Sequence, residues 1–108
     1  MLLGRHTAHF AKEHLMKSLI MFYLSDCGYC TKAFRTLDEL CSEKQLYFNT
    51  PIYAIEESEH PDIADQYDYY AVPSFFDGKK KLFEAHLFMS YNAIRNKVRR
   101  VLDYALTV

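Results

Sequence analysis

The chain has 108 residues, half of them hydrophobic, with nine tyrosines, eight phenylalanines and a formal net charge of −1. This length suffices for one domain with one core, and the high aromatic content argues against disorder. A net charge so close to zero provides no general attraction to nucleic acid or to a membrane surface, so neither is an expected partner.

Residues 1–17 form an N-terminal extension in which basic and histidine side chains recur. A short helix is predicted over residues 5–16. No apolar segment in this extension has the length of a secretory signal, and the longest apolar run, residues 19–24, is too short to span a bilayer. We therefore expect a cytoplasmic protein whose folded domain covers residues 18–108.

The rest of the chain alternates between strand and helix patterns. Residues 18–24 are continuously apolar, as in a central parallel strand that is covered on both faces. Asp77-Gly78 is a hairpin signal between two short strands. Ser58 and Ser90 are candidate N-terminal caps of helices. The predicted order is β-α-β-α-β-β-α, with strands at 18–24, 52–56, 74–76 and 80–85 and helices at 29–44, 58–67 and from 90 onward.

The first long helix has a clear apolar side. Its apolar residues recur at intervals of three and four, which places them on one stripe facing the core. The stripe consists of Cys30, Ala33, Phe34, Leu37, Leu40 and Cys41.

Two cysteines, Cys27 and Cys30, lie at the junction between the first strand and this helix, separated by Gly28 and Tyr29. Cys27 is expected at the helix N-terminus, where unpaired N–H groups and the helix dipole favour a thiolate. Cys30 lies about one turn later on the inward stripe. One exposed thiol and one sheltered thiol within bonding reach are what dithiol–disulfide exchange requires, and Gly28 would let a substrate backbone approach.

Zinc binding is the alternative interpretation of the Cys-x-x-Cys. A tetrahedral structural site needs four ligands, usually from two paired clusters. The sequence has only three cysteines, and its five histidines form no ligand pair near Cys27 and Cys30. We therefore expect no metal, and Cys41 is interpreted as a core residue because free cysteine packs as a small apolar side chain.

A second motif, Ala71-Val72-Pro73-Ser74, precedes the hairpin. Together with the Cys-x-x-Cys and the order of elements, it resembles the thioredoxin/glutaredoxin superfamily over residues 18–106, especially its small bacterial thioredoxin-like and glutaredoxin-like members. The resemblance implies an α/β thioredoxin-like fold with a central mixed sheet flanked by helices. It also implies that Pro73 is cis beside the cysteines, and that Val72 offers its backbone to the substrate.

The sequence departs from the family pattern at several places. Met21 stands where thioredoxins have a buried aspartate that assists proton transfer, and Asp26 stands where they have a tryptophan. A carboxylate at Asp26 is expected to raise the pKa of Cys27. Residues 86–90 lack the glycine pair and acidic residues with which glutaredoxins bind glutathione, so a glutathione site is disfavoured.

The favoured function is a thiol–disulfide oxidoreductase, with Cys27 as nucleophile, Cys30 as the resolving thiol, and Gly28, Tyr29, Val72 and Pro73 contacting the substrate. Its substrates would be protein disulfides or glutathione mixed disulfides, its electrons would come from a reductase or from glutathione, and it would need no bound cofactor. We expect a monomer or a weak dimer. Two alternatives stay open: a non-catalytic binding module with this fold, and a dimer that carries an iron–sulfur cluster with glutathione.

Overall fold

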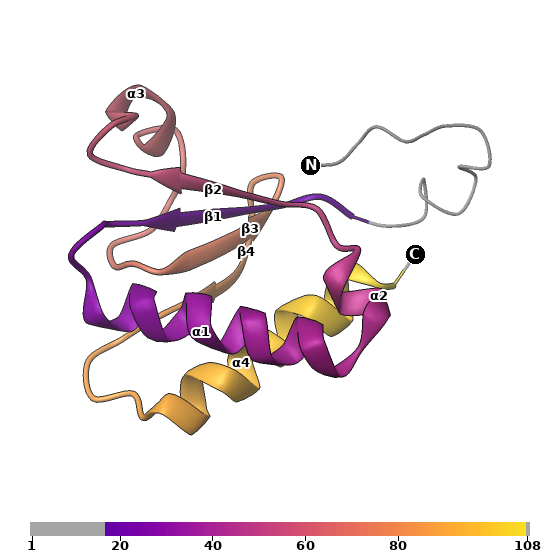
Figure 1. The fold of residues 1–108 in the computed structure, drawn as a ribbon. Coiled ribbons are helices and arrows are strands. Elements are labelled where there is room, and N and C mark those ends of the chain that lie inside the picture. Colours follow the sequence, from indigo (N-terminus) through magenta and orange to yellow (C-terminus); the bar gives the residue numbers. More distant parts are fainter. Residues whose placement is uncertain (1–16, 108) are drawn as a thin grey trace.

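The computed structural model describes residues 17–107, so the helix predicted over 5–16 lies outside the described residues. The elements follow one another in the predicted order, with one additional short helix (Figure 1). They are β1 (Leu19–Tyr23), α1 (Gly28–Glu43), α2 (Gln45–Phe48), β2 (Ile52–Glu56), α3 (Pro61–Ala64), β3 (Ser74–Asp77), β4 (Lys80–Glu84) and α4 (Tyr91–Ala105).

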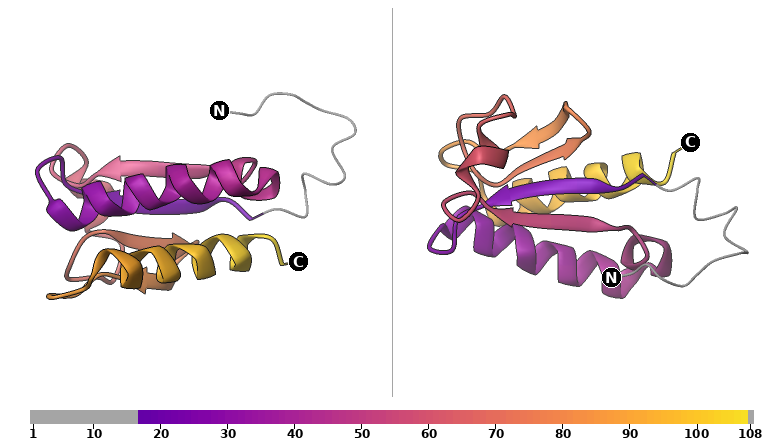
Figure 2. Two further views of the ribbon diagram at one scale, coloured as in Figure 1. Left: turned by 60° about the horizontal axis from the view of Figure 1, so that its bottom comes forward. Right: turned by 90° about the horizontal axis from the view of Figure 1, so that it is seen from above.

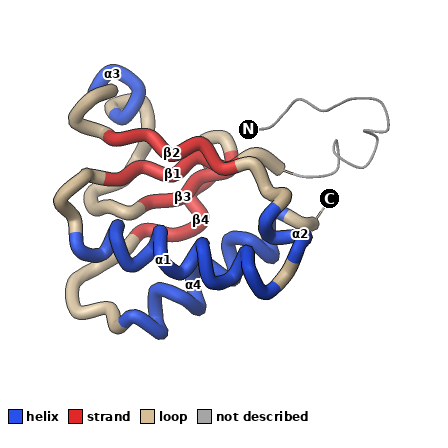
Figure 3. Tube along the Cα trace, viewed as in Figure 1, coloured by secondary structure: helices blue, strands red, loops and turns tan. Residues whose placement is uncertain are grey.

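The four strands form one mixed sheet in the order β2-β1-β3-β4 (Figure 3). β1 pairs in parallel with β2 and antiparallel with β3, and β3 pairs antiparallel with β4. The apolar strand β1 is therefore internal to the sheet, which confirms the prediction from its unbroken apolar run. The carboxyl ends of β1 and β2 lie at the same edge, from which the chain enters α1 and the segment before α3.

Helices α1 and α4 lie side by side and cover one face of the sheet (Figures 1 and 2). Alternate residues of β1, Leu19 and Met21, point into this layer together with Phe75 of β3. The apolar stripes of the two helices complete the core through Ala33, Leu37, Leu40, Ile94, Val98, Val101, Leu102 and Ala105. Ser90 caps α4 as predicted, since its Oγ accepts a hydrogen bond from the Ala93 N–H at 3.0 Å.

The opposite face of the sheet is covered by aromatic residues from the segment between α3 and β3. Phe22 of β1 and Phe76 of β3 are fully buried there. The rings of Tyr67 and Tyr69 both lie 4.9 Å from the Phe22 ring, centroid to centroid, and they also contact Phe76. This loop thus supplies the second apolar layer that an internal strand needs.

Two sequence expectations are wrong in detail. The helix over 58–67 shortens to α3, and Ser58 does not cap it, because its N–H and Oγ both donate to the carboxylate of Glu56. Helix α2 was not predicted. Lys44 ends α1 in an extended conformation, and Tyr47 then buries its ring and hydrogen-bonds Asp103 of α4, a tertiary contact without a sequence signal.

Candidate functional site

Cys27 is the N-cap residue of α1. Its backbone is extended, with φ −100° and ψ 118°, and its Sγ accepts a hydrogen bond from the Cys30 N–H at 3.2 Å. The side chain thus occupies the position that serine or aspartate usually takes, and it satisfies one of the free N–H groups of the first turn. The sulfur is partly exposed at the end of a helix whose dipole favours negative charge.

Cys30 lies one turn later and is buried, with 1% of its surface exposed. Burial, followed by a hydrogen bond with the Cys27 sulfur, raises the pKa of the Cys30 thiol to about 12. At neutral pH this thiol is therefore protonated. The structure brings together two sulfurs in unlike environments, one accessible and one sheltered beneath it, as the helical spacing predicted.

The Val72–Pro73 segment lies directly beside Cys27. The peptide bond between these residues is cis, and the Cys27 thiol donates a weak hydrogen bond to the Val72 carbonyl at 3.7 Å. Glu84 of β4 fixes the preceding loop, because its carboxylate accepts from the N–H groups of Tyr70 and Ala71 at 2.8 and 2.7 Å. Sequence analysis missed Glu84, since nothing in an alternating edge strand indicates which carboxylate turns toward a loop.

Gly28 and Tyr29 occupy the two positions between the cysteines. A Cβ at Gly28 would meet no atom within 4 Å, so the space above this residue is open. The Tyr29 hydroxyl accepts a hydrogen bond from the Phe88 N–H at 2.7 Å, and Phe88 has a positive φ of 68°. The motif is therefore tied to the loop before α4, which presents Leu87 and Phe88 to solvent with 72% and 94% of their surfaces exposed.

Met21 occupies the position at which a carboxylate was expected from the family pattern. Met21 is fully buried in the core. The negative charge of Glu57 contributes a minor part of the raised pKa of Cys30. Glu57 follows directly after β2, so the parallel pairing of β1 and β2 places it at the same edge of the sheet as the dithiol.

Glu56 ties together the two loops that leave this edge. Its carboxylate accepts from the N–H and Oγ of Ser25, at 3.0 and 2.9 Å, and from the N–H and Oγ of Ser58, at 2.6 and 2.5 Å. The hydrogen bond from the Ser58 side chain, followed by that from the Ser25 N–H, lowers the pKa of Glu56 to about 2. These bonds hold the loop from which Cys27 projects.

A pH effect on stability follows from this depressed pKa. A carboxyl whose pKa is lower in the folded state stabilises the fold above its unfolded pKa, here 4.5, and loses that contribution as the pH falls toward about 2. We expect Glu56→Gln to lower Tm by roughly 5–10 °C at pH 7, and by less at pH 3. Thermal melts at both pH values measure this. Glu59→Gln, on the same loop and exposed, is the control, and an equal loss at both pH values would contradict the assignment.

The remaining cysteine is remote from this pair. Cys41 lies on α1 and packs partly buried against the core, about 16 Å along the helix from Cys30. Within residues 17–107, no three histidine, cysteine or acidic side chains converge to hold a metal ion. In the same range, no helix has the length and apolar character needed to cross a membrane.

Comparison with known proteins identifies similarity at the level of structure. No family model and no curated protein matches the sequence. Thioredoxin O1 from Arabidopsis thaliana matches with 21% identity and a TM-score of 0.52, covering 84% of this chain and 82% of that one. Thioredoxin 1 from Thermosipho africanus matches with 17% identity and a TM-score of 0.50, covering 81% of this chain and 96% of that one. At such identities the similarity concerns the fold alone.

Proposed function

The chain has a thioredoxin-like fold, and from this premise we propose that it is a thiol–disulfide oxidoreductase. The observation that carries the proposal is the unlike placement of the two sulfurs. Cys27 is accessible at the N-terminus of α1, whereas Cys30 is buried one turn later and protonated at neutral pH. An accessible attacking thiol and a sheltered resolving thiol form the minimal apparatus for disulfide exchange.

The proposed reaction has two displacement steps. The Cys27 thiolate attacks one sulfur of the substrate disulfide, forming a mixed disulfide and releasing the first substrate thiolate, which takes a proton from water. The Cys30 sulfur then attacks Cys27 Sγ, which breaks the mixed disulfide, and the proton of Cys30 passes to the departing second thiolate. The substrate is reduced to two thiols and the protein is oxidised to a Cys27–Cys30 disulfide. A reductase or glutathione would return it to the dithiol.

Protein disulfides fit this site as substrates. Apolar side chains project around the dithiol from separate loops, with Tyr70, Leu87 and Phe88 exposed at 94%, 72% and 94%. Exposed apolar residues of this kind favour contact with another protein. Gly28, Tyr29, Val72 and Pro73 are the proposed contacts for the segment that carries the substrate disulfide, since they flank the Cys27 sulfur.

Cys30→Ser provides the test of the proposed roles. This variant keeps the attacking sulfur but removes the resolving one, so we expect mixed disulfides on Cys27 to accumulate and persist. Non-reducing gels and mass spectrometry of adducts formed with oxidised insulin would detect them. Cys41→Ser is the matched control and should trap nothing. If wild type reduces insulin while Cys30→Ser traps no adduct, the role assignment fails. A pure binding module would show no insulin reduction at all.

A further inference from the structure

We propose that the cavity between α3 and the loop before Pro73 binds a basic side chain of the substrate protein, with arginine preferred, next to the disulfide that is reduced. This inference rests on the proposed function and specifies its substrate. It assigns to Asp65 and Glu57 the role of selecting disulfides that have a positive charge nearby.

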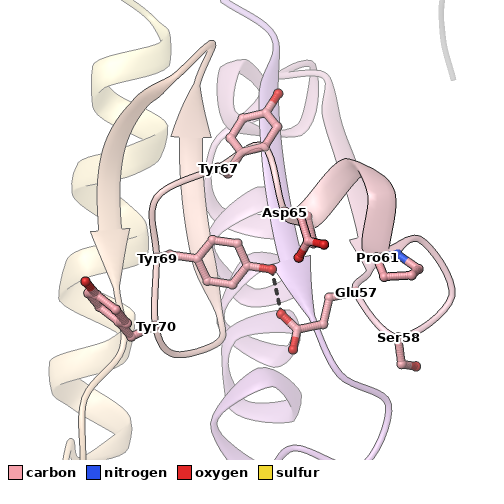
Figure 4. A pocket seen from close by; sticks show the side chains of 8 residues that line it. Glu57, Ser58, Pro61, Asp65, Tyr67, Tyr69 and Tyr70 are labelled. Carbon is pink, nitrogen blue, oxygen red and sulfur yellow. Dashed lines mark hydrogen bonds between the residues drawn. The ribbon is translucent and has the colours of Figure 1, made fainter.

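The cavity has a volume of about 370 Å³ and opens to solvent beside the end of β2. Figure 4 shows the side chains that line it. Its floor and walls combine carboxylates with aromatic rings: Glu57, Asp65, Tyr67, Tyr69 and Tyr70. A cavity with this combination is suited to a group that is both cationic and flat.

The negative charge of the cavity is concentrated around one hydroxyl. The Tyr69 hydroxyl donates to the Glu57 carboxylate at 2.5 Å. Burial raises the pKa of Tyr69, and the Glu57 hydrogen bond and the charges of Glu57 and Asp65 raise it further, so both carboxylates act on the same point. Figure 4 shows Asp65 and Glu57 on neighbouring sides of that hydroxyl. In the part of the chain that the structure describes, no hydrogen bond or salt bridge engages the Asp65 carboxylate, which leaves it available to a ligand.

The aromatic rings of the cavity pack against the sheet, and one of them already contacts a cation. Tyr69 stacks on Phe22 of the sheet and Tyr67 packs against the same ring at a tilt, so Phe22 supports both tyrosine rings. The ammonium of Lys79 lies 4.7 Å from the centroid of the Tyr67 ring, so the protein itself places a cation on one of these rings. An arginine side chain fits such surroundings better than lysine, because its planar guanidinium stacks on rings, is weakly hydrated and bonds carboxylates in pairs.

The cavity is close enough to the dithiol to be reached by the same substrate segment. Tyr70 lines it and precedes Val72, the residue that contacts the Cys27 sulfur, by two positions, a span of at most about 7 Å. On its other side, the Glu57 N–H bonds the Tyr23 carbonyl at 2.9 Å, at the end of the strand that leads to Cys27. A basic residue within a few positions of the substrate cysteine can therefore enter.

Paired peptide disulfides test the inference. Each pair carries either arginine or neutral citrulline two residues before or two residues after the cysteine, and kcat/KM is measured for both members. We expect wild type to prefer the arginine peptide about tenfold in at least one placement. Asp65→Asn and Glu57→Gln should each reduce this preference severalfold at low salt. Asp62→Asn, which removes the same charge from α3 outside the cavity, should leave it unchanged.

The outcomes separate this inference from the proposed function. Reduction of all peptides at equal rates, or a preference that survives in Asp65→Asn, would overturn the inference and leave the oxidoreductase intact. If wild type reduces neither the peptides nor insulin, the proposed function fails. The cavity is then tested by titrating the protein with serine-for-cysteine versions of the peptides and following the NMR signals of Tyr67 and Tyr69. Shifts with arginine but not citrulline support the cavity, and no shifts reject it.

Discussion

Replacing Cys27 by serine is expected to lower the rate of disulfide reduction at least about 1,000-fold, because it removes the only accessible thiol of the pair. Cys30 cannot substitute for it. Its side chain is 1% exposed and burial raises its pKa to about 12, so at neutral pH it is neither reachable nor ionised. Reduction of insulin disulfides, followed by turbidity and by thiol release, measures the loss.

The control for this experiment is Cys41→Ser, which removes a partly buried thiol on the same helix and should keep wild-type activity. The Cys27→Ser protein should also melt close to wild type, since a serine Oγ can accept the N-cap hydrogen bond from Cys30. An active Cys27→Ser variant would mean that Cys30 attacks substrates directly, which its burial opposes.

Phe22→Ala is expected to destabilise the domain by about 3–5 kcal/mol. Phe22 is fully buried and supports the rings of Tyr67 and Tyr69, so its loss opens a cavity beneath the layer that covers one face of the sheet. This cost is a large part of the total stability of a small domain, about 5–15 kcal/mol. Urea unfolding followed by circular dichroism measures it through a lower midpoint.

Tyr53→Ala is the comparison for Phe22→Ala. Tyr53 is an aromatic residue of the neighbouring strand β2, but 51% of its surface is exposed, so its replacement should cost less than about 1 kcal/mol. If both variants lose equal stability, the second aromatic layer does not contribute as the packing implies.

Most of the fold was predictable because local patterns and tertiary structure agree. The apolar run of β1 predicts a strand covered on both faces, and the structure places layers on both sides of it. The spacing of Cys30, Ala33 and Leu37 predicts the inward side of α1, and all three are buried. Because this periodicity also sets where Cys27 and Cys30 point, the unlike environments of the two thiols were predictable as well.

What the sequence did not indicate depends on contacts between distant segments. Nothing distinguishes Glu56 from Glu57 in the sequence, yet one carboxylate binds two serines and the other a tyrosine hydroxyl. The cluster of tyrosines after α3 has no helical or strand periodicity. Its role, to cover the face of β1 that α1 and α4 leave uncovered, is visible only in the folded structure. The cavity and the Tyr29–Phe88 contact likewise arise from segments that are distant in the sequence.

Because the Cys27 sulfur caps α1, the oxidation state of the dithiol affects the stability of the first turn of this helix. In the reduced form, Cys27 Sγ satisfies the Cys30 N–H, whereas a sulfur bonded to another sulfur is a poorer acceptor. An N-cap hydrogen bond stabilises a helix by about 1 kcal/mol. Because only the dithiol form makes this bond fully, the midpoint potential of the Cys27–Cys30 couple is higher by about 20 mV than it would be without the bond. The hydrogen bond that begins the helix thus also makes the disulfide form a slightly stronger oxidant.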